Sequence, residues 1–330
     1  MTPRDIFQLA DRYCDSALLQ HAHAAGVFDA LTTPKSAGEI AASLGWVPIK
    51  TAIFLDALTA LGLLVKDGVA FKNAPATSEC LVRGRPGYIG DLIEHERLQW
   101  SLWGRLGDVL ASEGPVSGQQ DLNLPADEYA NAVFHRAMMQ LAGELLGVVT
   151  SLPEWEGVRH VLDLAGGHGL YLGELARRHP RITGEVWDVP SARPHAETLL
   201  ASLGVGDRVR FVERDIAAPA SYAGVRADAV MLNHCLHHFD PATVGAILRS
   251  VAGTLPTGGI VVALDVHLDR TRTSPAENAL FSAYMMVNTV RGQVHPTDEV
   301  AALLRESGFA VENRLLDSLE GDYLMVGRKV

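Results

Sequence analysis

The sequence predicts an α/β protein in two parts, a helical N-terminal part followed by a doubly wound parallel sheet. Three observations support this prediction. A strand, a glycine-rich turn and a helix follow one another over residues 161–179. After them, apolar strand-like runs alternate with helical stretches, which is typical of a doubly wound sheet. Before residue 75, helices lead into a short hairpin. We therefore expect two domains, residues 1–150 and 151–330.

The N-terminal part begins with helical patterns over residues 6–25, 36–45 and 49–61. Ser36, with Glu39 three residues later, forms a capping box that marks the start of the second helix. Residues 63–71 then predict a hairpin, because Asp67-Gly68 favours the tight turn between two antiparallel strands. Helices followed by a small hairpin make a winged-helix unit.

A winged-helix unit often suggests DNA binding, but the charges argue against it here. The presumed recognition helix, residues 49–61, carries one lysine, Lys50, and one aspartate, Asp56. Such a helix cannot neutralise phosphates. The net charge of −11 also provides no basic footprint for nucleic acid. We therefore interpret the unit as a dimerisation module and expect a homodimer with no nucleic-acid partner.

The composition is that of a globular protein, with 48% hydrophobic and 20% charged residues. No apolar run reaches the roughly 18 residues that a membrane span needs, and the N-terminus lacks the apolar core of a signal peptide. The three cysteines, Cys14, Cys80 and Cys235, are odd in number and far apart, which fits a reducing compartment. We expect a cytoplasmic protein with no membrane partner.

A helical stretch over residues 87–110 holds candidate substrate residues, namely Arg97, Trp100 and Trp103. The two tryptophans either pack in a core or form an aromatic wall for a substrate pocket. An arginine can bind a carboxylate, although arginines on helices are usually solvated. Both interpretations of these side chains remain open from the sequence.

The glycine loop favours a nucleotide-like cofactor with a cationic end. Gly166, Gly167 and Gly169 allow the backbone to approach a ligand closely, and the following helix offers free N–H groups. Asp163, just ahead of the glycines, would repel a pyrophosphate. Asp188 ends the next strand 22 residues after Gly166, where an acid accepts hydrogen bonds from ribose hydroxyls. Together these residues suggest S-adenosylmethionine (SAM).

Polar residues follow the predicted strands at one edge of the sheet. The strands lie near residues 160–164, 184–188, 209–212, 228–232, 259–264 and 323–327. The polar residues at their ends are Asp163, Asp188, Asp215, Asn233 and Asp265. Ligands of doubly wound sheets bind beyond the carboxyl ends of the strands, so we expect the site there.

These motifs, in this order, resemble the class I SAM-dependent methyltransferases of the small-molecule O-methyltransferase family over essentially the full length. The matching segments are Phe134-His-Arg-Ala-Met138, Asp163-Leu-Ala-Gly-Gly-His-Gly169, Asp188-Val-Pro190, Arg214-Asp-Ile216 and Leu232-Asn-His-Cys-Leu-His237. The resemblance implies a Rossmann-like SAM-binding domain with an N-terminal winged-helix dimerisation domain. It implies a cofactor site of Asp163, Gly166, Gly167, Asp188, Asp215, Ile216, Asn233, Phe134 and Met138, with Asp188 at the ribose and Asp215 and Ile216 beside adenine. It also implies that His237 is catalytic.

Two departures from the family pattern bear on the reaction. The family follows its catalytic histidine with Asp-Trp, whereas this chain has His238-Phe239. The family's supporting glutamate is replaced by Val294 or His295, depending on register. A histidine that deprotonates a phenol needs a carboxylate to fix its tautomer and raise its basicity. The missing partner argues against ordinary O-methylation.

The histidines instead suggest a metal. His237 and His295 would face one cavity from two loops, and two imidazoles leave coordination positions for substrate and water. The pattern is similar to that of the 2-oxo acid C-methyltransferases of natural-product pathways. We therefore predict a zinc or iron ion that is chelated by a 2-oxo acid and promotes methyl transfer to its C3. The base would be a metal-bound hydroxide or an unligated histidine, with His238 as the candidate. Arg97, Trp100 and Trp103 would contact the substrate.

Two alternatives remain. One is an O-methyltransferase of a phenolic or polyketide hydroxyl, with His237 as general base; EDTA would not affect it, but would abolish the metal-dependent reaction. The other is a non-catalytic, cofactor-binding regulator that contacts DNA through the winged helix. The acidic composition and the intact glycine loop argue against this second alternative.

Overall fold

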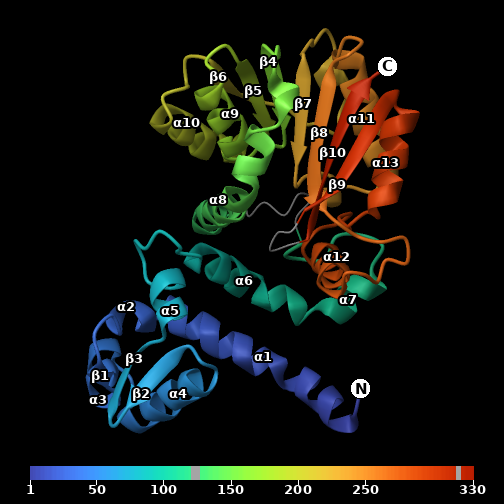
Figure 1. The fold of residues 1–330 in the computed structure, drawn as a ribbon. Helices are drawn as coiled ribbons and strands as arrows, with labels where there is room; N and C mark the ends of the chain where they lie inside the picture. Colours follow the sequence, from blue (N-terminus) through green and yellow to red (C-terminus); the bar gives the residue numbers. More distant parts are fainter. Residues whose placement is uncertain (120–126, 317–320) are drawn as a thin grey trace. The chain divides into compact units, whose positions relative to one another are not determined.

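The structure, a computed structural model, describes residues 1–119, 127–316 and 321–330 (Figure 1). The chain divides into two compact units, Met1–Trp100 and Ser101–Val330. The sequence placed the domain boundary near residue 150, which is the end of the long helix α8 (Glu128–Thr150). That functional division into two domains stays a prediction.

The first unit is mostly helical and contains a small sheet. Its elements are α1 (Pro3–Ala24), α2 (Val27–Ala30), β1 (Lys35–Ser36), α3 (Ala37–Leu44), α4 (Pro48–Ala60), β2 (Leu64–Asp67), β3 (Ala70–Asn73), α5 (Pro75–Cys80) and the start of α6 (Gly90–Trp103). The strands pair in the order β1-β3-β2. The capping box is confirmed, since the Ser36 and Glu39 side chains each accept from the other residue's amide. Phe28, Leu55 and Phe71 lie in its core.

The second unit is built on a seven-stranded sheet in the order β6-β5-β4-β7-β8-β10-β9. Its strands are β4 (His160–Leu164), β5 (Thr183–Asp188), β6 (Val209–Glu213), β7 (Ala229–Asn233), β8 (Ile260–Val266), β9 (Phe309–Leu315) and β10 (Asp322–Lys329). The first five are parallel, as predicted. The last two depart from the prediction, because β10 runs antiparallel to β8 and β9, and β9 was not predicted.

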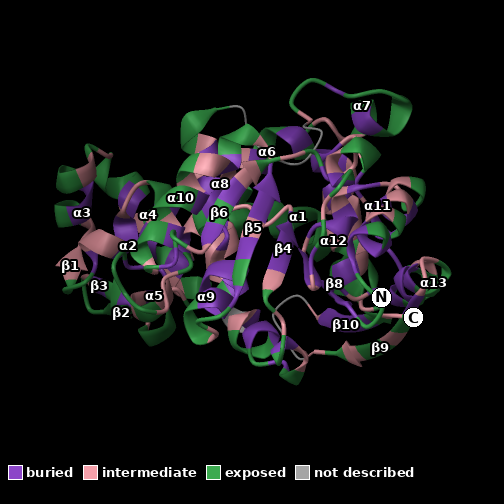
Figure 2. Cartoon of the chain, turned by 90° about the horizontal axis from the view of Figure 1, so that it is seen from above, coloured by how far each residue is buried: buried purple, intermediate pink, exposed green. Residues whose placement is uncertain are grey.

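Helices cover both faces of this sheet, which confirms the α/β Rossmann-like fold. They are α8, α9 (Leu170–Arg178), α10 (Arg193–Ser202), α11 (Pro241–Thr254) and α13 (Thr297–Glu306). The unit also contains α7 (Leu106–Ala111) and α12 (Ala276–Asn288), which contact each other. Successive strand residues point to opposite faces. Val161 therefore packs in the core with α8, α9 and α10, while Leu162 packs in the core with α11 and α13. Figure 2 shows the central strands largely buried.

Among the described residues, no single helix has both the length and the apolar character of a membrane span. Only α3 and α4 together pass that test, and they meet at an angle of 114°.

Candidate active site

The glycine loop between β4 and α9 has the strand, turn and helix order that the sequence predicted. Ala165, Gly167 and Gly169 have φ angles of 52°, 52° and 73°, in the left-handed region that glycine adopts at low cost. Gly166 is needed for a different reason. A Cβ there would lie 2.6 Å from the carboxyl group of Asp163, so any side chain would displace that carboxylate.

Asp163 is a buried carboxyl group without a side-chain partner among the described residues. It is 1% exposed, and neither oxygen makes a hydrogen bond within the described part of the chain. Burial and the nearby charge of Asp188 raise its pKa to about 8. The backbone of Leu172 lowers this pKa, but by less. An unpaired buried carboxyl is costly unless a ligand completes it. The group therefore fits the cationic end of a cofactor such as SAM.

Two more polar side chains lie at the ends of the neighbouring strands. Asp188 accepts hydrogen bonds from the amides of Gly167 and Val189, each at 2.7 Å, and burial raises its pKa to about 6. Asn233, the last residue of β7, is 8% exposed and has no described partner for either atom of its amide. Since β5, β4 and β7 are adjacent, these groups and Asp163 form one polar edge.

The remaining predicted cofactor residues belong to the same unit. Asp215 and Ile216 follow β6, and Asp215 accepts from the amide of Ala217 at 2.8 Å. Phe134 and Met138 lie one turn apart on α8. Their individual roles stay predictions.

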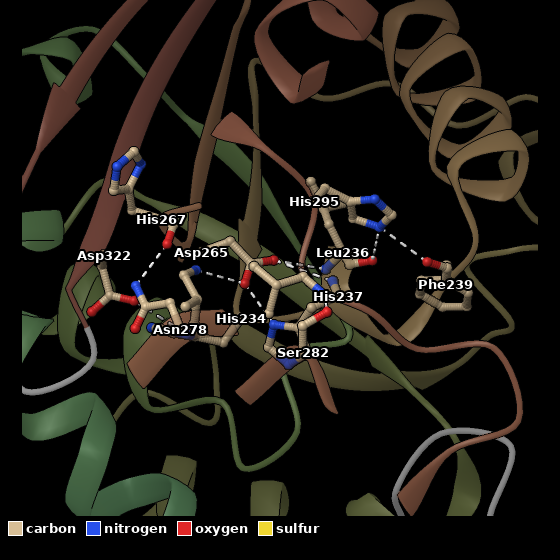
Figure 3. A network of polar contacts seen from close by, with 12 residues as sticks. His234, Leu236, His237, Phe239, Asp265, His267, Asn278, Ser282, His295 and Asp322 are labelled. Atoms are coloured by element: carbon tan, nitrogen blue, oxygen red, sulfur yellow. Dashed lines mark hydrogen bonds and ion pairs between the residues drawn. The ribbon is translucent and has the colours of Figure 1, made fainter. Parts of the chain in front are cut away.

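The predicted catalytic histidine does have a carboxylate partner. His237 lies in the short 3-10 helix Leu236–His238 after β7, and its Nδ1 donates to Oδ1 of Asp265 at 2.5 Å (Figure 3). Oδ2 of Asp265 accepts from the amides of Leu236 and His237 at 3.1 and 3.3 Å. Burial alone would raise the pKa of Asp265, but the charge of His237 and this hydrogen bond lower it well below its ordinary value.

The sequence-based argument that His237 lacks a carboxylate was therefore wrong. The partner comes from the end of β8 rather than from the loop at residues 294–295. Strands β7 and β8 are parallel neighbours with Asn233 opposite Leu264, so Asp265 is carried beside the segment after β7. The sequence did show Asp265 as an acid at the end of a predicted strand, but no local pattern indicated that it pairs with His237.

The structure gives no support for a metal site formed by His295 and His237. Its Nε2 faces two carbonyl oxygens, Leu236 O at 3.3 Å and Phe239 O at 3.0 Å (Figure 3). Carbonyl oxygens only accept, so this nitrogen carries a proton and cannot ligate a cation. No group of three or more histidine, cysteine or acidic residues in the described ranges is arranged to hold a metal. The predicted zinc or iron ion thus has no support, and His295 instead braces the turn that carries His237.

His238 is buried beside His237, with ring centroids 4.6 Å apart. Burial, together with the charge of His237, lowers its pKa to about 3. An imidazole with this pKa is a weak base at neutral pH. The assignment of His238 as a base stays a prediction that the geometry does not favour.

The three predicted substrate residues are divided between the units. Arg97 and Trp100 lie in the first unit, where Arg97 pairs with Glu94 at 2.7 Å. Trp103 lies in the second unit, with its ring 6.4 Å from that of Tyr284 on α12. Their contact with substrate stays a prediction.

Sequence reasoning missed the contribution of α12. The ring of Phe281 meets His237 edge-on at 5.3 Å and stacks on Tyr284 at 5.7 Å. Asn288, at the end of α12, donates through Nδ2 to Tyr284 O, while its buried Oδ1 has no partner in the described segments. No motif marks these residues in the sequence, because only the packing of α12 places Phe281 against His237 and Tyr284 against Phe281.

Two family models match the chain. An O-methyltransferase domain covers residues 122–310, and an O-methyltransferase dimerisation domain covers residues 7–83. The first match spans more than half of the 330 residues.

Known proteins similar to the chain extend this result. The tetracenomycin polyketide synthesis 8-O-methyl transferase TcmO of Streptomyces glaucescens is 30% identical, over 99% of this chain and 97% of that protein. The N,N-dimethyltransferase OxyT of Streptomyces rimosus is also 30% identical, over 99% and 96%. The solved structure of an O-methyltransferase family protein from Burkholderia thailandensis has a TM-score of 0.93 and 40% identity, covering 100% and 98% of the two chains.

These matches overturn the prediction of C-methylation of a 2-oxo acid. That prediction rested on a metal held by His237 and His295 and on a catalytic histidine without a carboxylate. The described residues provide neither feature, and the family model and TcmO are both of the O-methyltransferase type. The chain is a SAM-dependent methyltransferase that belongs to the O-methyltransferase family.

Proposed function

We propose that the enzyme methylates a phenolic hydroxyl of an aromatic, polyketide-like molecule, with His237 as general base. The observation that carries this proposal is the hydrogen bond from Nδ1 of His237 to Asp265 at 2.5 Å. It fixes the tautomer in which Nε2 is the basic nitrogen. The polyketide substrate named for TcmO supports the choice of acceptor.

The chain's own residues account for proton removal. When bound, SAM supplies an electrophilic methyl group. Nε2 of His237 takes the proton of the phenol, which leaves the phenol oxygen as the nucleophile for the methyl group that SAM would supply. The anionic Asp265 then stabilises the imidazolium that forms. A phenol has a pKa near 10, so a positioned base contributes a substantial part of the rate, typically 10²- to 10⁴-fold.

The backbone around His237 is held in place from the loop after α12. Gln293 donates its amide to His237 O at 2.9 Å, and the Gly292 amide donates to the hydroxyl of Thr289 at 2.7 Å. A Cβ on Gly292 would lie 2.9 Å from His237 O, so only glycine fits this close approach. Together with His295, this loop fixes the position of the base before substrate arrives.

The surroundings of His237 suit a flat acceptor with polar substituents. The stacked pair Phe281 and Tyr284, with Trp103 near Tyr284, provides aromatic surface. Asn288, one turn beyond Tyr284 on α12, has a buried Oδ1 with no described partner, and this atom can accept a hydrogen bond.

We also propose a homodimer. The dimerisation-domain match covers residues 7–83. Helix α1 in that region exposes several large apolar side chains, Ile6, Phe7, Leu9 and Tyr13, at 57%, 67%, 55% and 61%. Exposed apolar side chains of this kind favour burial against a second copy.

A labelled-methyl assay tests the acceptor and the base together. The purified enzyme is incubated with methyl-labelled SAM and a panel of hydroxyanthraquinones, hydroxynaphthoates, the matching arylamines and 2-oxo acids. We expect methyl ethers from the phenols, no loss with EDTA, and a fall in kcat of roughly 10²- to 10⁴-fold for His237→Gln.

S-adenosylhomocysteine binding is the control for His237→Gln. It should stay within about threefold of wild type, because the described ring contacts of His237 include Asp265, His238 and Phe281, which lie outside the glycine loop. Turnover of arylamines alone would contradict the proposed acceptor. More than a tenth of the activity left in His237→Gln would contradict the proposed base.

A further inference from the structure

A buried imidazole on α8 lacks hydrogen bonds from the protein around it. His135 is 1% exposed, and neither of its ring nitrogens has a partner in the described part of the chain. Buried polar groups in folded proteins are nearly always paired, so two unused atoms in one ring need an explanation. None of the steps described above uses this side chain.

His135 lies against the glycine loop. A Cβ built on Gly167 would be 3.7 Å from Nδ1 and Cε1 of His135, and 3.9 Å from Oδ2 of Asp188. The imidazole and the carboxylate therefore flank the same glycine, whose amide already donates to that carboxylate. A ligand bound over Gly167 would meet both side chains.

The ring of His135 is held by packing rather than by hydrogen bonds. It stacks on the ring of His195 from α10, with centroids 4.3 Å apart and planes at 29°. The ring of His168 meets it edge-on at 6.4 Å. His168 differs in having a backbone partner, since its Nδ1 accepts from the amide of Leu170 at 3.1 Å.

A second polar atom on α8 is left unused one turn earlier. Asn131, four residues before His135 and hence on the same face of the helix, donates through Nδ2 to Ser191 O at 3.4 Å. Its buried Oδ1 has no described partner. Helix α8 therefore presents incompletely paired polar groups toward the segment that follows β5 and Asp188.

Burial, helped by the charges of His195 and His168, lowers the pKa of His135 to about 3. The ring is therefore neutral at physiological pH and has one N–H donor and one acceptor nitrogen. A hydroxyl group can satisfy either nitrogen, because it both donates and accepts. Asp188, when ionised, can only accept.

We propose that His135 is a cofactor-binding residue that, together with Asp188, hydrogen-bonds the ribose hydroxyls of SAM over Gly167. The proposal rests on the cofactor assignment and is independent of which hydroxyl group the enzyme methylates. It explains why the protein leaves both nitrogens of a buried ring unpaired, since the ligand completes one of them.

The test replaces His135 by phenylalanine, which keeps an aromatic ring for the stack with His195 and removes both nitrogens. We expect S-adenosylhomocysteine to bind roughly 10- to 100-fold more weakly by titration calorimetry, as for the loss of one buried hydrogen bond. The melting temperature of the ligand-free protein should stay equal or rise, because two unpaired polar atoms leave the interior. A purely structural histidine would not show this opposite pair of effects.

His195→Phe is the matched control, since it changes the other ring of the same stack. Its affinity for S-adenosylhomocysteine should stay within about threefold of wild type. Equal losses in both variants, or an unchanged affinity in His135→Phe, would show that the stack serves packing alone and would overturn the proposal.

A second ligand locates the contact. 5′-Methylthioadenosine has the ribose but lacks the amino-acid part, so His135→Phe should weaken both ligands by the same factor. A loss confined to S-adenosylhomocysteine would place the contact at the amino-acid part and overturn the ribose assignment. If the wild-type protein bound neither ligand, the cofactor assignment itself would fail, which is a different outcome from a failure of His135.

Discussion

His237 and the glycine loop both follow parallel strands of one sheet, but they differ in how far their buried polar groups are hydrogen-bonded by the protein. Around His237, Asp265 accepts from the ring and from two backbone amides, and His295 faces two carbonyl oxygens. Around the loop, Asp163 and Asn233 have buried polar atoms with no described partner. The protein thus supplies the hydrogen bonds of Asp265 by itself, and leaves those of Asp163 and Asn233 for a ligand to supply.

This difference follows from what each region has to do. A general base must be in the correct tautomer and position when the substrate arrives, so its hydrogen bonds come from the protein. A cofactor site must gain free energy when the cofactor binds, and unpaired buried groups provide that gain. Changes at Asp265 should therefore affect turnover, whereas changes at Asp163 should affect binding and the stability of the empty protein.

The largest effect is expected at Asp265. Asp265→Asn removes the charge that stabilises the His237 imidazolium and the acceptor that fixes its tautomer, so kcat should fall roughly 10²- to 10⁴-fold. Initial rates with a phenolic acceptor measure this fall, and calorimetry with S-adenosylhomocysteine should show an affinity within about threefold of wild type. A large loss of cofactor affinity with little change in kcat would contradict the assignment of Asp265 to turnover rather than to cofactor binding.

A smaller effect is expected at Asp163. Asp163→Asn keeps the shape of the side chain but removes its negative charge, so the cationic end of SAM should bind roughly 10- to 100-fold more weakly. Equilibrium binding of SAM, with Asp215→Asn as a comparison at the same sheet edge, measures this loss. Unchanged affinity for SAM would mean that the buried carboxylate does not meet the cofactor.

The smallest effect concerns the pH dependence of the empty protein. The folded pKa of Asp163, about 8, lies above its unfolded value near 3.9. The folded state therefore holds the extra proton, and its contribution to stability, complete below about pH 4, is lost as the pH rises to about 8. Asp188, with a pKa of about 6, acts in the same direction over a narrower range.

Thermal melts of wild type and Asp163→Asn without ligand test this dependence. Between pH 5 and 8 the melting temperature of wild type should fall by several degrees relative to that of the variant. Saturating S-adenosylhomocysteine should reduce the difference, because its cationic group favours the ionised carboxylate. Parallel melting curves without ligand would show that Asp163 already has a partner in the empty protein.

Much of the fold could be predicted from local patterns. Alternating apolar runs and the glycine loop identified the five parallel strands, and the Ser36 capping box marked a helix start that the structure confirms. The antiparallel end of the sheet was not predictable in this way. Strand β9 alternates weakly and is half exposed, and its pairing with β10 depends on a chain reversal that residues 309–315 do not encode locally.

The candidate site was predicted in part for the same reason. His237 and the strand-end residues Asp163, Asp188 and Asn233 stood out as motifs, and the structure places them at one edge of the sheet. The partner of His237 was missed because Asp265 lies 28 residues away in the chain. The family pattern pointed instead to residues 294–295, which lie even further along the chain, and so to a metal site that the described residues do not contain.

The sequence by itself determined the type of protein, because the glycine loop, the strand-end acids and the helix caps are each recognisable from residues next to them in the chain. Several such local patterns in order along the chain indicated a SAM-binding α/β domain. Only the tertiary structure decided the chemistry. Hydrogen bonds between side chains on different strands depend on strand order and register, and these set Asp265 against His237 and turned His295 toward two carbonyl oxygens.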